Sequence, residues 1–212
     1  MSGLRAKHKA DRRRRILEAA TALFRDVGYE RSKIETIAAR AEVSVGTIYN
    51  YYRNKGDVLV AIVSMEVNEV LNAGRGVVAH PPANVGDALD TLIGIYIEHS
   101  LIYLDKGMWR QAMAISTQQP DSPFGLTYGD LDRALTDQIC ALIVRLQELG
   151  LVRADIDGRA VGELVFNNMN MMFIEFVKRQ DAEIPELRAA IRRQNRILVE
   201  AVGKVARRAL QA

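Results

Sequence analysis

The side chains best suited to recognition chemistry lie close together, between residues 44 and 55. They offer hydroxyl groups, an amide and an ammonium group, all of which donate hydrogen bonds to phosphate oxygens, and an amide also pairs bidentately with adenine. The set comprises Ser44, Thr47, Tyr49, Asn50, Tyr51 and Lys55, with Val45 and Gly46 between them. Because a glycine lets the backbone approach a ligand closely, this combination favours binding to the backbone and base edges of a nucleic acid.

Residue types that carry out catalysis do not converge in the same way. The three histidines, His8, His80 and His99, are scattered and have no metal-ligand spacing to Cys, Asp or Glu. Cys140 lies within an apolar run and resembles a packed thiol, not a nucleophile. Because the sequence also contains no phosphate-binding glycine loop and no nucleophile elbow, we expect no enzyme, no metal site and no cofactor.

Charge is distributed unevenly along the chain. The 212 residues carry a formal net charge of +3, yet residues 1–60 hold 13 Lys/Arg against 7 Asp/Glu, and residues 61–212 hold 16 against 19. A basic end on a mildly acidic body indicates a polyanionic partner, either nucleic acid or a membrane surface. The basic arm between Arg5 and Arg15 can follow phosphates or enter a minor groove, and the alternative is a solubilising tail.

Composition narrows the class of protein. Apolar residues make up 49% of the chain, which is enough for a core. The longest apolar runs have six residues, whereas a membrane-spanning helix needs about 20. The basic N-terminal region is not followed by the apolar stretch of a secretory signal. A single cysteine cannot form an internal disulfide, so we expect a cytoplasmic protein without a membrane span.

The elements that position the recognition residues are predicted to be helices. A first helix over about 10–27 precedes a short one that starts at a capping box, Ser32 to Glu35, and ends near residue 41. A third helix, capped by Ser44, covers about 45–52. Two short helices joined by a tight turn and braced by a preceding helix form a helix-turn-helix, in which Ile48 and Tyr52 face inward.

The rest of the chain also has helical periodicity, so we predict an all-α fold of about nine helices. Asn54 caps a fourth helix, and Asp155 or Asp157 caps the eighth. The later helices are expected over about 55–73, 84–105, 106–117, 123–150, 157–179 and from 185 onward. We divide the chain into a DNA-binding domain with a basic arm, residues 1–60, and a second helical domain, residues 61–212, for which the family resemblance described next implies ligand binding and dimerisation.

Residues 12–63 resemble the DNA-binding domain of the tetracycline-repressor (TetR) family of bacterial transcriptional regulators. The similarity covers about a quarter of the chain and is specific because many positions agree in order. Tyr52 stands where phenylalanine is more usual. The matching residues are Arg15 to Ala20, Leu23-Phe24, Gly28-Tyr29, Ile37-Ala38, Ala41 to Tyr52, Asn54-Lys55 and Leu59.

The resemblance implies roles for individual positions. Phosphate contacts are implied for Ser44, Thr47, Tyr49 and Lys55. Approach to base edges is implied for Val45, Gly46, Asn50 and Tyr51. Additional backbone contacts are implied for Lys33 and Glu35, which begin the preceding helix.

The resemblance also implies a homodimer and a C-terminal sensor for a small molecule. The last two predicted helices repeat apolar residues every three or four positions, a stripe that runs from Leu187 to Val205 and Ala209 in the final helix. The preceding helix is apolar on both sides, so we expect it to be buried all round, partly against a partner subunit. An effector pocket is expected among Tyr96, His99, Tyr103, Met108, Trp109, Met113, Tyr128, Phe166, Asn167, Asn170 and Phe173.

These features predict a repressor that binds an inverted-repeat operator as a dimer and is released by an apolar or amphipathic effector, with the fourth helix as the lever. A corepressor that favours the DNA-bound spacing is equally compatible with the residues, and an activator is the lesser alternative to a repressor. The alternative from another class is a membrane-associated or scaffolding helical protein, for which polyanion binding would depend on salt but not on sequence.

Overall fold

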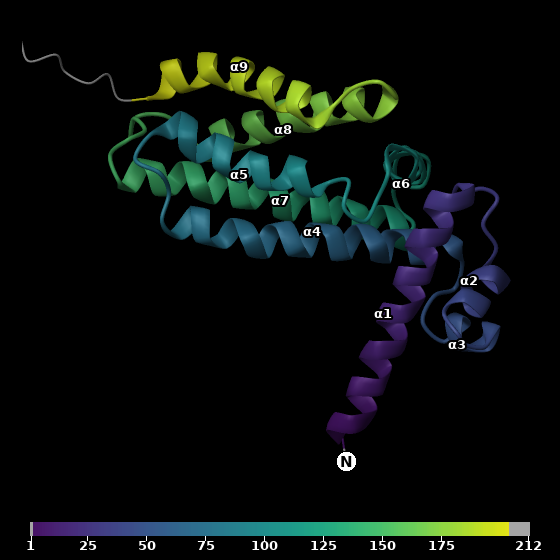
Figure 1. Ribbon diagram of the computed structural model, residues 1–212. Helices are drawn as coiled ribbons and strands as arrows, with labels where there is room; N and C mark the ends of the chain where they lie inside the picture. The colour runs from purple at the N-terminus through teal and green to yellow at the C-terminus, as the bar shows by residue number, and fades with distance from the viewer. Residues whose placement is uncertain (1, 204–212) are drawn as a thin grey trace, which may run out of the picture. The chain divides into compact units, whose positions relative to one another are not determined.

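The computed structural model describes residues 2–203, with side chains from residue 6 onward, and this part of the chain is built from helices (Figure 1). Strand-like pairing within this range is limited to one isolated bridge between Val152 and Gly203. The all-α prediction is confirmed for the described residues. The nine helices found there are α1 (Ser2–Val27), α2 (Ile34–Arg40), α3 (Val45–Tyr49), α4 (Lys55–Ala79), α5 (Val85–His99), α6 (Lys106–Gln118), α7 (Pro123–Glu148), α8 (Gly158–Lys178) and α9 (Ile184–Val202).

Several helix ends differ from the prediction. α1 begins at Ser2 instead of near residue 10, because the intervening residues are mostly good helix formers without proline. α4 is longer than expected and α5 stops at His99, where the Ser100 carbonyl accepts the indole N–H of Trp109 at 2.6 Å. Val205, Ala209 and the side chain of Arg5, which also entered the predictions, lie outside the described residues.

The predicted capping box at the start of α2 is wrong. Ser32 is buried, and its hydroxyl donates to the carbonyl of Gly28 at 2.8 Å. Lys33 is the N-cap of α2 and makes no side-chain capping bond. Gly28, with φ of +85°, ends α1, so the Ser32 hydroxyl serves the end of the first helix and not the start of the second.

Two compact units make up the structure, and each combines two segments of the chain. Within the described residues, the first consists of residues 2–68 and 100–131, and the second of residues 69–99 and 132–203. α4 and α7 are each continuous across the change of unit. The functional boundary at residue 60 stays a prediction.

The first unit contains the predicted helix-turn-helix. α2 packs against both α1 and α3 (Figure 1). Phe24, Ile37, Ile48 and Leu59 are fully buried between these helices and the start of α4. The guanidinium of Arg25, at the end of α1, donates to the carbonyls of the segment that precedes α6, at Leu101 (3.1 Å) and at Ile102.

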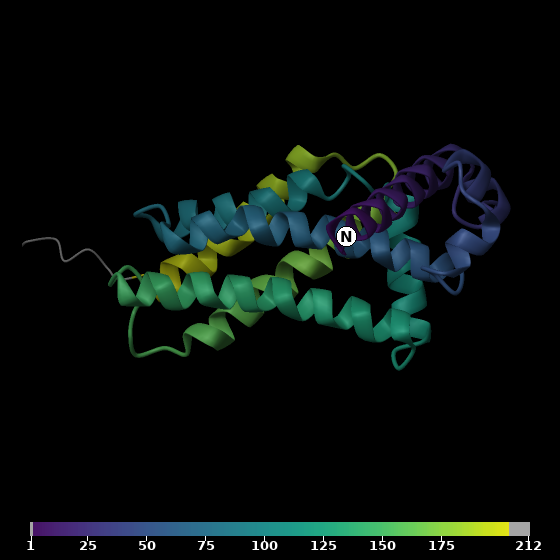
Figure 2. The same cartoon turned by 90° about the horizontal axis from the view of Figure 1, so that it is seen from below.

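The second unit is a bundle in which α9 packs against both α5 and α8 (Figures 1 and 2). α7 and α8 approach closely: a Cβ at Gly162 would lie 2.6 Å from the Cα of Cys140. Gln138 on α7 accepts the phenol proton of Tyr96 at 2.6 Å and donates to the carbonyl of Leu71 at 2.8 Å, so it connects three helices. No helix in the described range is long and apolar enough to cross a bilayer.

Candidate nucleic-acid interface

The candidate recognition helix α3 is short and firmly started. Ser44 is its N-cap, as predicted, and the Ser44 Oγ accepts the backbone N–H of Thr47 at 3.0 Å. The hydroxyls of these two residues also lie 2.8 Å apart. The helix ends at Tyr49, with Asn50 as C-cap, three residues earlier than predicted. The turn before it contains Glu42 at φ of 53°, a left-handed conformation.

The side chains of α3 divide into an inward and an outward set. Ile48 is fully buried and Tyr52 is 6% exposed, which confirms that both face the core. Tyr49 is 50% exposed, and Asn50 is also exposed. Ser44 and Gly46 are exposed, whereas Val45 and Thr47 are half-buried. A short helix with an apolar inner side and a small polar outer side is the form that enters a major groove.

Tyr51 and Tyr52 both turn toward α1. The Tyr51 hydroxyl, on a half-buried side chain, donates to the carbonyl of Lys9 at 3.5 Å. The Tyr52 hydroxyl accepts from the Nε of Arg13 at 3.4 Å, and burial raises the pKa of this phenol. α1 therefore holds the segment that follows α3 through two phenols.

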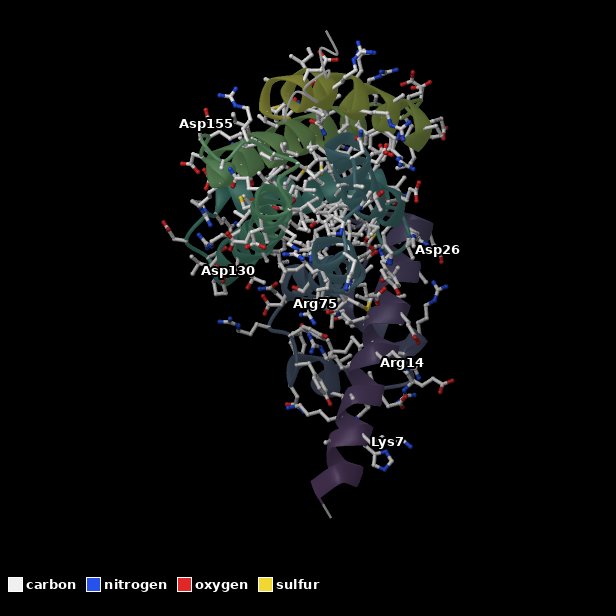
Figure 3. The ribbon with its side chains drawn as sticks, turned by 90° about the vertical axis from the view of Figure 1, so that its left-hand side faces the viewer. Lys7, Arg14, Asp26, Arg75, Asp130 and Asp155 are labelled. Atoms are coloured by element: carbon white, nitrogen blue, oxygen red, sulfur yellow. The ribbon has the colours of Figure 1, made fainter. Side chains whose placement is uncertain are left out.

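The basic residues that were predicted as an arm lie on the helix α1. Figure 3 shows Lys7 and Arg14 projecting from it. Arg14 is bound to Asp11 and Glu18, each at 2.8 Å, which lowers the pKa of Asp11. Lys7, Lys9 and Arg12 are exposed on the same helix, so these cations follow one regular element.

Lys33 and Glu35, the two predicted contacts on α2, are exposed. Lys55, the predicted contact at the start of α4, is half-buried and differs from them. Its ammonium donates to the carbonyls of Tyr29 at 2.6 Å, Glu30 at 3.0 Å and Ser32 at 3.3 Å. It also lies 4.2 Å from the centroid of the Tyr29 ring.

α4 itself is capped as predicted. The Asn54 Oδ1 accepts the N–H of Asp57 at 2.9 Å, and the Asp57 carboxylate accepts the N–H of Arg53 at 2.9 Å. These two bonds fix the first turn of the helix and hence the position of the Lys55 backbone.

The predicted effector residues fall into both compact units. Several are tied to neighbours: the Nε2 of His99 lies 3.3 Å from a carboxylate oxygen of Glu69, and Tyr128 stacks on Phe124 at 6.4 Å between centroids. Asn167 is exposed on α8. The first unit holds Tyr103, Met108, Trp109, Met113 and Tyr128, and the second holds Tyr96, His99, Phe166, Asn167, Asn170 and Phe173.

Within a single chain α8 is buried on one side only, and the burial of its other side against a partner subunit stays a prediction. Leu164 is 59% exposed and Met171 is 58% exposed, on the same side of the helix as Asn167. On the neighbouring helix α9, Ile197 is 71% exposed. The other side of α8 carries the buried residues, among them Phe166 and Phe173.

Two structural residues were missed from the sequence. Arg25 gave no signal, because one arginine near a helix end resembles any surface cation. Glu66 lies on α4 and is 2% exposed. A carboxylate three residues after the apolar run 58–63 was the available signal for it. In the part of the chain that the structure describes, no three His, Cys, Asp or Glu residues are grouped to hold a metal ion.

Known proteins resemble the chain both locally and as a whole. The family model for bacterial regulatory proteins of the tetR family matches residues 16–62. The transcriptional repressor KstR of Rhodococcus jostii is 36% identical over 72 residues, which is 34% of each chain. The transcriptional regulator HbdR of Aromatoleum is 47% identical over 49 residues, 23% of this chain and 21% of HbdR. The chain thus matches about a third or less of the length of these curated relatives.

Solved structures extend the likeness to the whole fold. A TetR-family transcriptional regulator from Pectobacterium atrosepticum has a TM-score of 0.70 at 17% identity, and the match covers 94% of this chain and 97% of that one. FadR of Thermus thermophilus, solved with lauroyl-CoA, has a TM-score of 0.63 at 24% identity. The match covers 94% of this chain and 98% of that one. Residues 16–62 therefore match the DNA-binding region of the tetR family of bacterial regulatory proteins, and the chain as a whole has the fold of solved TetR-family regulators.

Proposed function

We propose that the protein is a transcriptional repressor that binds an inverted-repeat DNA operator as a dimer and leaves it when a small effector binds. The observation that carries this proposal is the outer side of α3, where Tyr49 is half exposed while Ile48 beneath it is fully buried. An exposed tyrosine on a five-residue helix contributes little to a core but offers a hydroxyl to a phosphate.

Contacts with DNA are assigned as follows. Ser44, Thr47 and Tyr49 bind phosphates, with support from Lys33 and Glu35 at the start of α2. Val45, Gly46, Asn50 and Tyr51 approach the base edges. Lys55 stands apart from these residues, because its ammonium is held by carbonyls of its own chain.

The dimer contact is assigned to α8 and α9. Leu164, Met171 and Ile197 expose large apolar side chains on these two adjacent helices. A second copy of the chain would cover them in a four-helix contact, which is the self-complementary arrangement of most dimers. A dimer is also what places two recognition helices at the half-site spacing of an inverted repeat.

The effector is assigned to the apolar or amphipathic class. In the first unit Met108 and Trp109 are buried, and in the second unit Tyr96 and Phe166 are buried. A ligand releases the operator only if it binds the released state more tightly than the bound state. The complex of Thermus thermophilus FadR with lauroyl-CoA makes long-chain acyl-CoA a reasonable first probe.

The test is selection of genomic DNA fragments by the purified protein at near-physiological salt, followed by sequencing. A shared inverted repeat among the recovered fragments supports a dimeric regulator. Recovery of fragments without a common sequence contradicts the proposal. Adding lauroyl-CoA to the complex then separates an inducer, which lowers operator affinity, from a corepressor, which raises it.

A further inference from the structure

The segment between α1 and α2 encloses a cation. Residues 28–33 form a tight turn in which the Ser32 N–H donates to the Tyr29 carbonyl at 3.2 Å and the Ser32 hydroxyl donates to the Gly28 carbonyl at 2.8 Å. The turn directs three carbonyl acceptors to one point, where the Lys55 ammonium lies. We call this arrangement of the three carbonyls and the Tyr29 ring the lysine cage.

The lysine cage uses the full hydrogen-bonding capacity of its occupant. An ammonium group has three N–H donors, and Lys55 has three carbonyl partners within 3.3 Å. The face of Tyr29 covers it at 4.2 Å, a favourable position for a cation. A phosphate could therefore gain this ammonium only by replacing an existing carbonyl partner.

The tyrosine that closes the lysine cage is itself held in place. Its ring packs edge-on against Phe24 of α1, with 5.2 Å between centroids. Burial, with a smaller effect of Glu30, raises the pKa of Tyr29 to about 12, so the phenol stays neutral. Its hydroxyl would lie 3.8 Å from a Cβ placed on Gly56, so the ring also covers the first turn of α4.

We propose that Lys55 is a positioning residue for the recognition helix and not a phosphate contact: its ammonium fills the lysine cage and ties the start of α4 to the turn that leads into α2 and α3. The inference rests on the proposed function, because its effect on the recognition helix is measured as affinity for operator DNA. A displacement of the first turn of α4 would be transmitted by this cation to residues 29–32 and from there to α2.

A phosphate contact and a positioning residue respond in opposite ways when Lys55 is replaced by arginine. A guanidinium binds phosphate at least as well as an ammonium, so a phosphate contact tolerates Lys55→Arg. A planar fork cannot direct three N–H groups at converging carbonyls beside an aromatic ring, so the lysine cage does not tolerate it. Lys178→Arg is the matched control, because Lys178 is an exposed cation of the second unit, paired with Glu175 at 2.6 Å, and is assigned no contact with DNA.

The experiment measures operator affinity of the full-length protein across a series of salt concentrations, together with hydrogen exchange of the amides of residues 29–33. We expect Lys55→Arg and Lys55→Met each to weaken binding about tenfold or more at every salt concentration. The salt slope should stay at the wild-type value, and exchange in residues 29–33 should accelerate. Lys178→Arg should bind within about twofold of wild type.

The proposal is overturned if Lys55→Arg binds like wild type while Lys55→Met lowers the salt slope by about 0.9, the value expected for one phosphate that is no longer neutralised. Tyr29→Leu retains Lys55 but removes the aromatic ring of the lysine cage. We expect it to lose as much operator affinity as Lys55→Met while the salt slope stays at the wild-type value. A measurement without any substitution is the NMR signal of the Lys55 ammonium in the free protein. It should be protected from rapid proton exchange and should not shift when operator DNA is added.

The lysine cage and the proposed function fail in distinguishable ways. If the wild-type protein selects no shared DNA sequence, the proposed function is wrong, and the ammonium signal and hydrogen exchange still test the cage in the free protein. If the protein binds its operator and the ammonium shifts on adding DNA, the cage is wrong and the regulator stands.

Discussion

The close approach of α7 and α8 leads to a prediction for Gly162→Ala. The added Cβ would lie 2.6 Å from the Cα, 2.9 Å from the backbone N and 2.7 Å from the Sγ of Cys140. Two of these atoms belong to the backbone and cannot rotate away, so the helices would have to separate by roughly 1 Å to restore van der Waals contact. Overpacking of this kind costs about 1–3 kcal/mol.

The same substitution also stabilises the helix itself, which opposes the cost of overpacking, and a control variant can measure this gain alone. Replacing a helical glycine by alanine usually stabilises by about 1 kcal/mol. Gly76 in α4 has nothing within 4 Å of an added Cβ, so Gly76→Ala should show the benefit alone. We expect Gly76→Ala to raise the Tm by up to about 4 °C, whereas Gly162→Ala should not raise it and should lower it by up to about 8 °C.

Thermal unfolding followed by circular dichroism measures both variants, at one fixed protein concentration because a dimer makes the Tm depend on concentration. A Tm for Gly162→Ala equal to or above that of Gly76→Ala would refute the close packing of α7 on α8. In the Gly162→Ala background, Cys140→Ala relieves only the Sγ contact and should therefore recover little stability.

Three further predictions concern the candidate interface and one buried acid. Tyr49→Ala should abolish sequence-specific DNA binding without changing the Tm, and Tyr49→Phe should lower the affinity for DNA about tenfold. Fluorescence anisotropy with operator DNA measures both affinities. Wild-type affinity of the alanine variant would refute the assigned recognition helix. Ser44→Ala removes the cap of α3 and should destabilise the protein by about 1 kcal/mol in chemical denaturation, whereas Ser44→Asp, which can still cap, should not. Burial raises the pKa of Asp132 to about 6 from a usual 3.8, so the folded protein holds this proton more tightly and loses stability as pH rises from about 4 to 6. Asp132→Asn should therefore raise the Tm at pH 7 but not at pH 4, and an equal rise at both values would show that the carboxyl titrates normally.

The helices of this protein were largely predictable, because the apolar residues of each recur at helical spacing and local signals mark the ends. Ser44 and Asn54 are helix caps as predicted, since a capping side chain acts on backbone three residues away. The same local rule failed at Ser32. Its hydroxyl had two possible backbone partners, and the packing of the turn selected the carbonyl behind it.

The contacts that depend on distant parts of the chain could not be read from the sequence. Lys55 appears as a cation beside a helix start, which is also the description of a phosphate-binding lysine. Its carbonyl partners lie 23 to 26 positions earlier in the sequence, and backbone carbonyls carry no residue-type signal. Arg25 is hidden in the same way, since its partners at 101 and 102 are also main-chain oxygens.

The continuity of α4 imposes a constraint on insertions. Its first residue, Lys55, occupies the lysine cage, and 16 positions later the Leu71 carbonyl accepts a hydrogen bond from Gln138. Each residue of an α-helix advances the axis by about 1.5 Å and turns it by about 100°. A single inserted residue between these two points would lengthen the helix by about 1.5 Å and rotate the Lys55 end by about 100° relative to the Leu71 end. Relatives that keep these two ends in the same phase should therefore vary in length in their loops and keep this span of α4 constant.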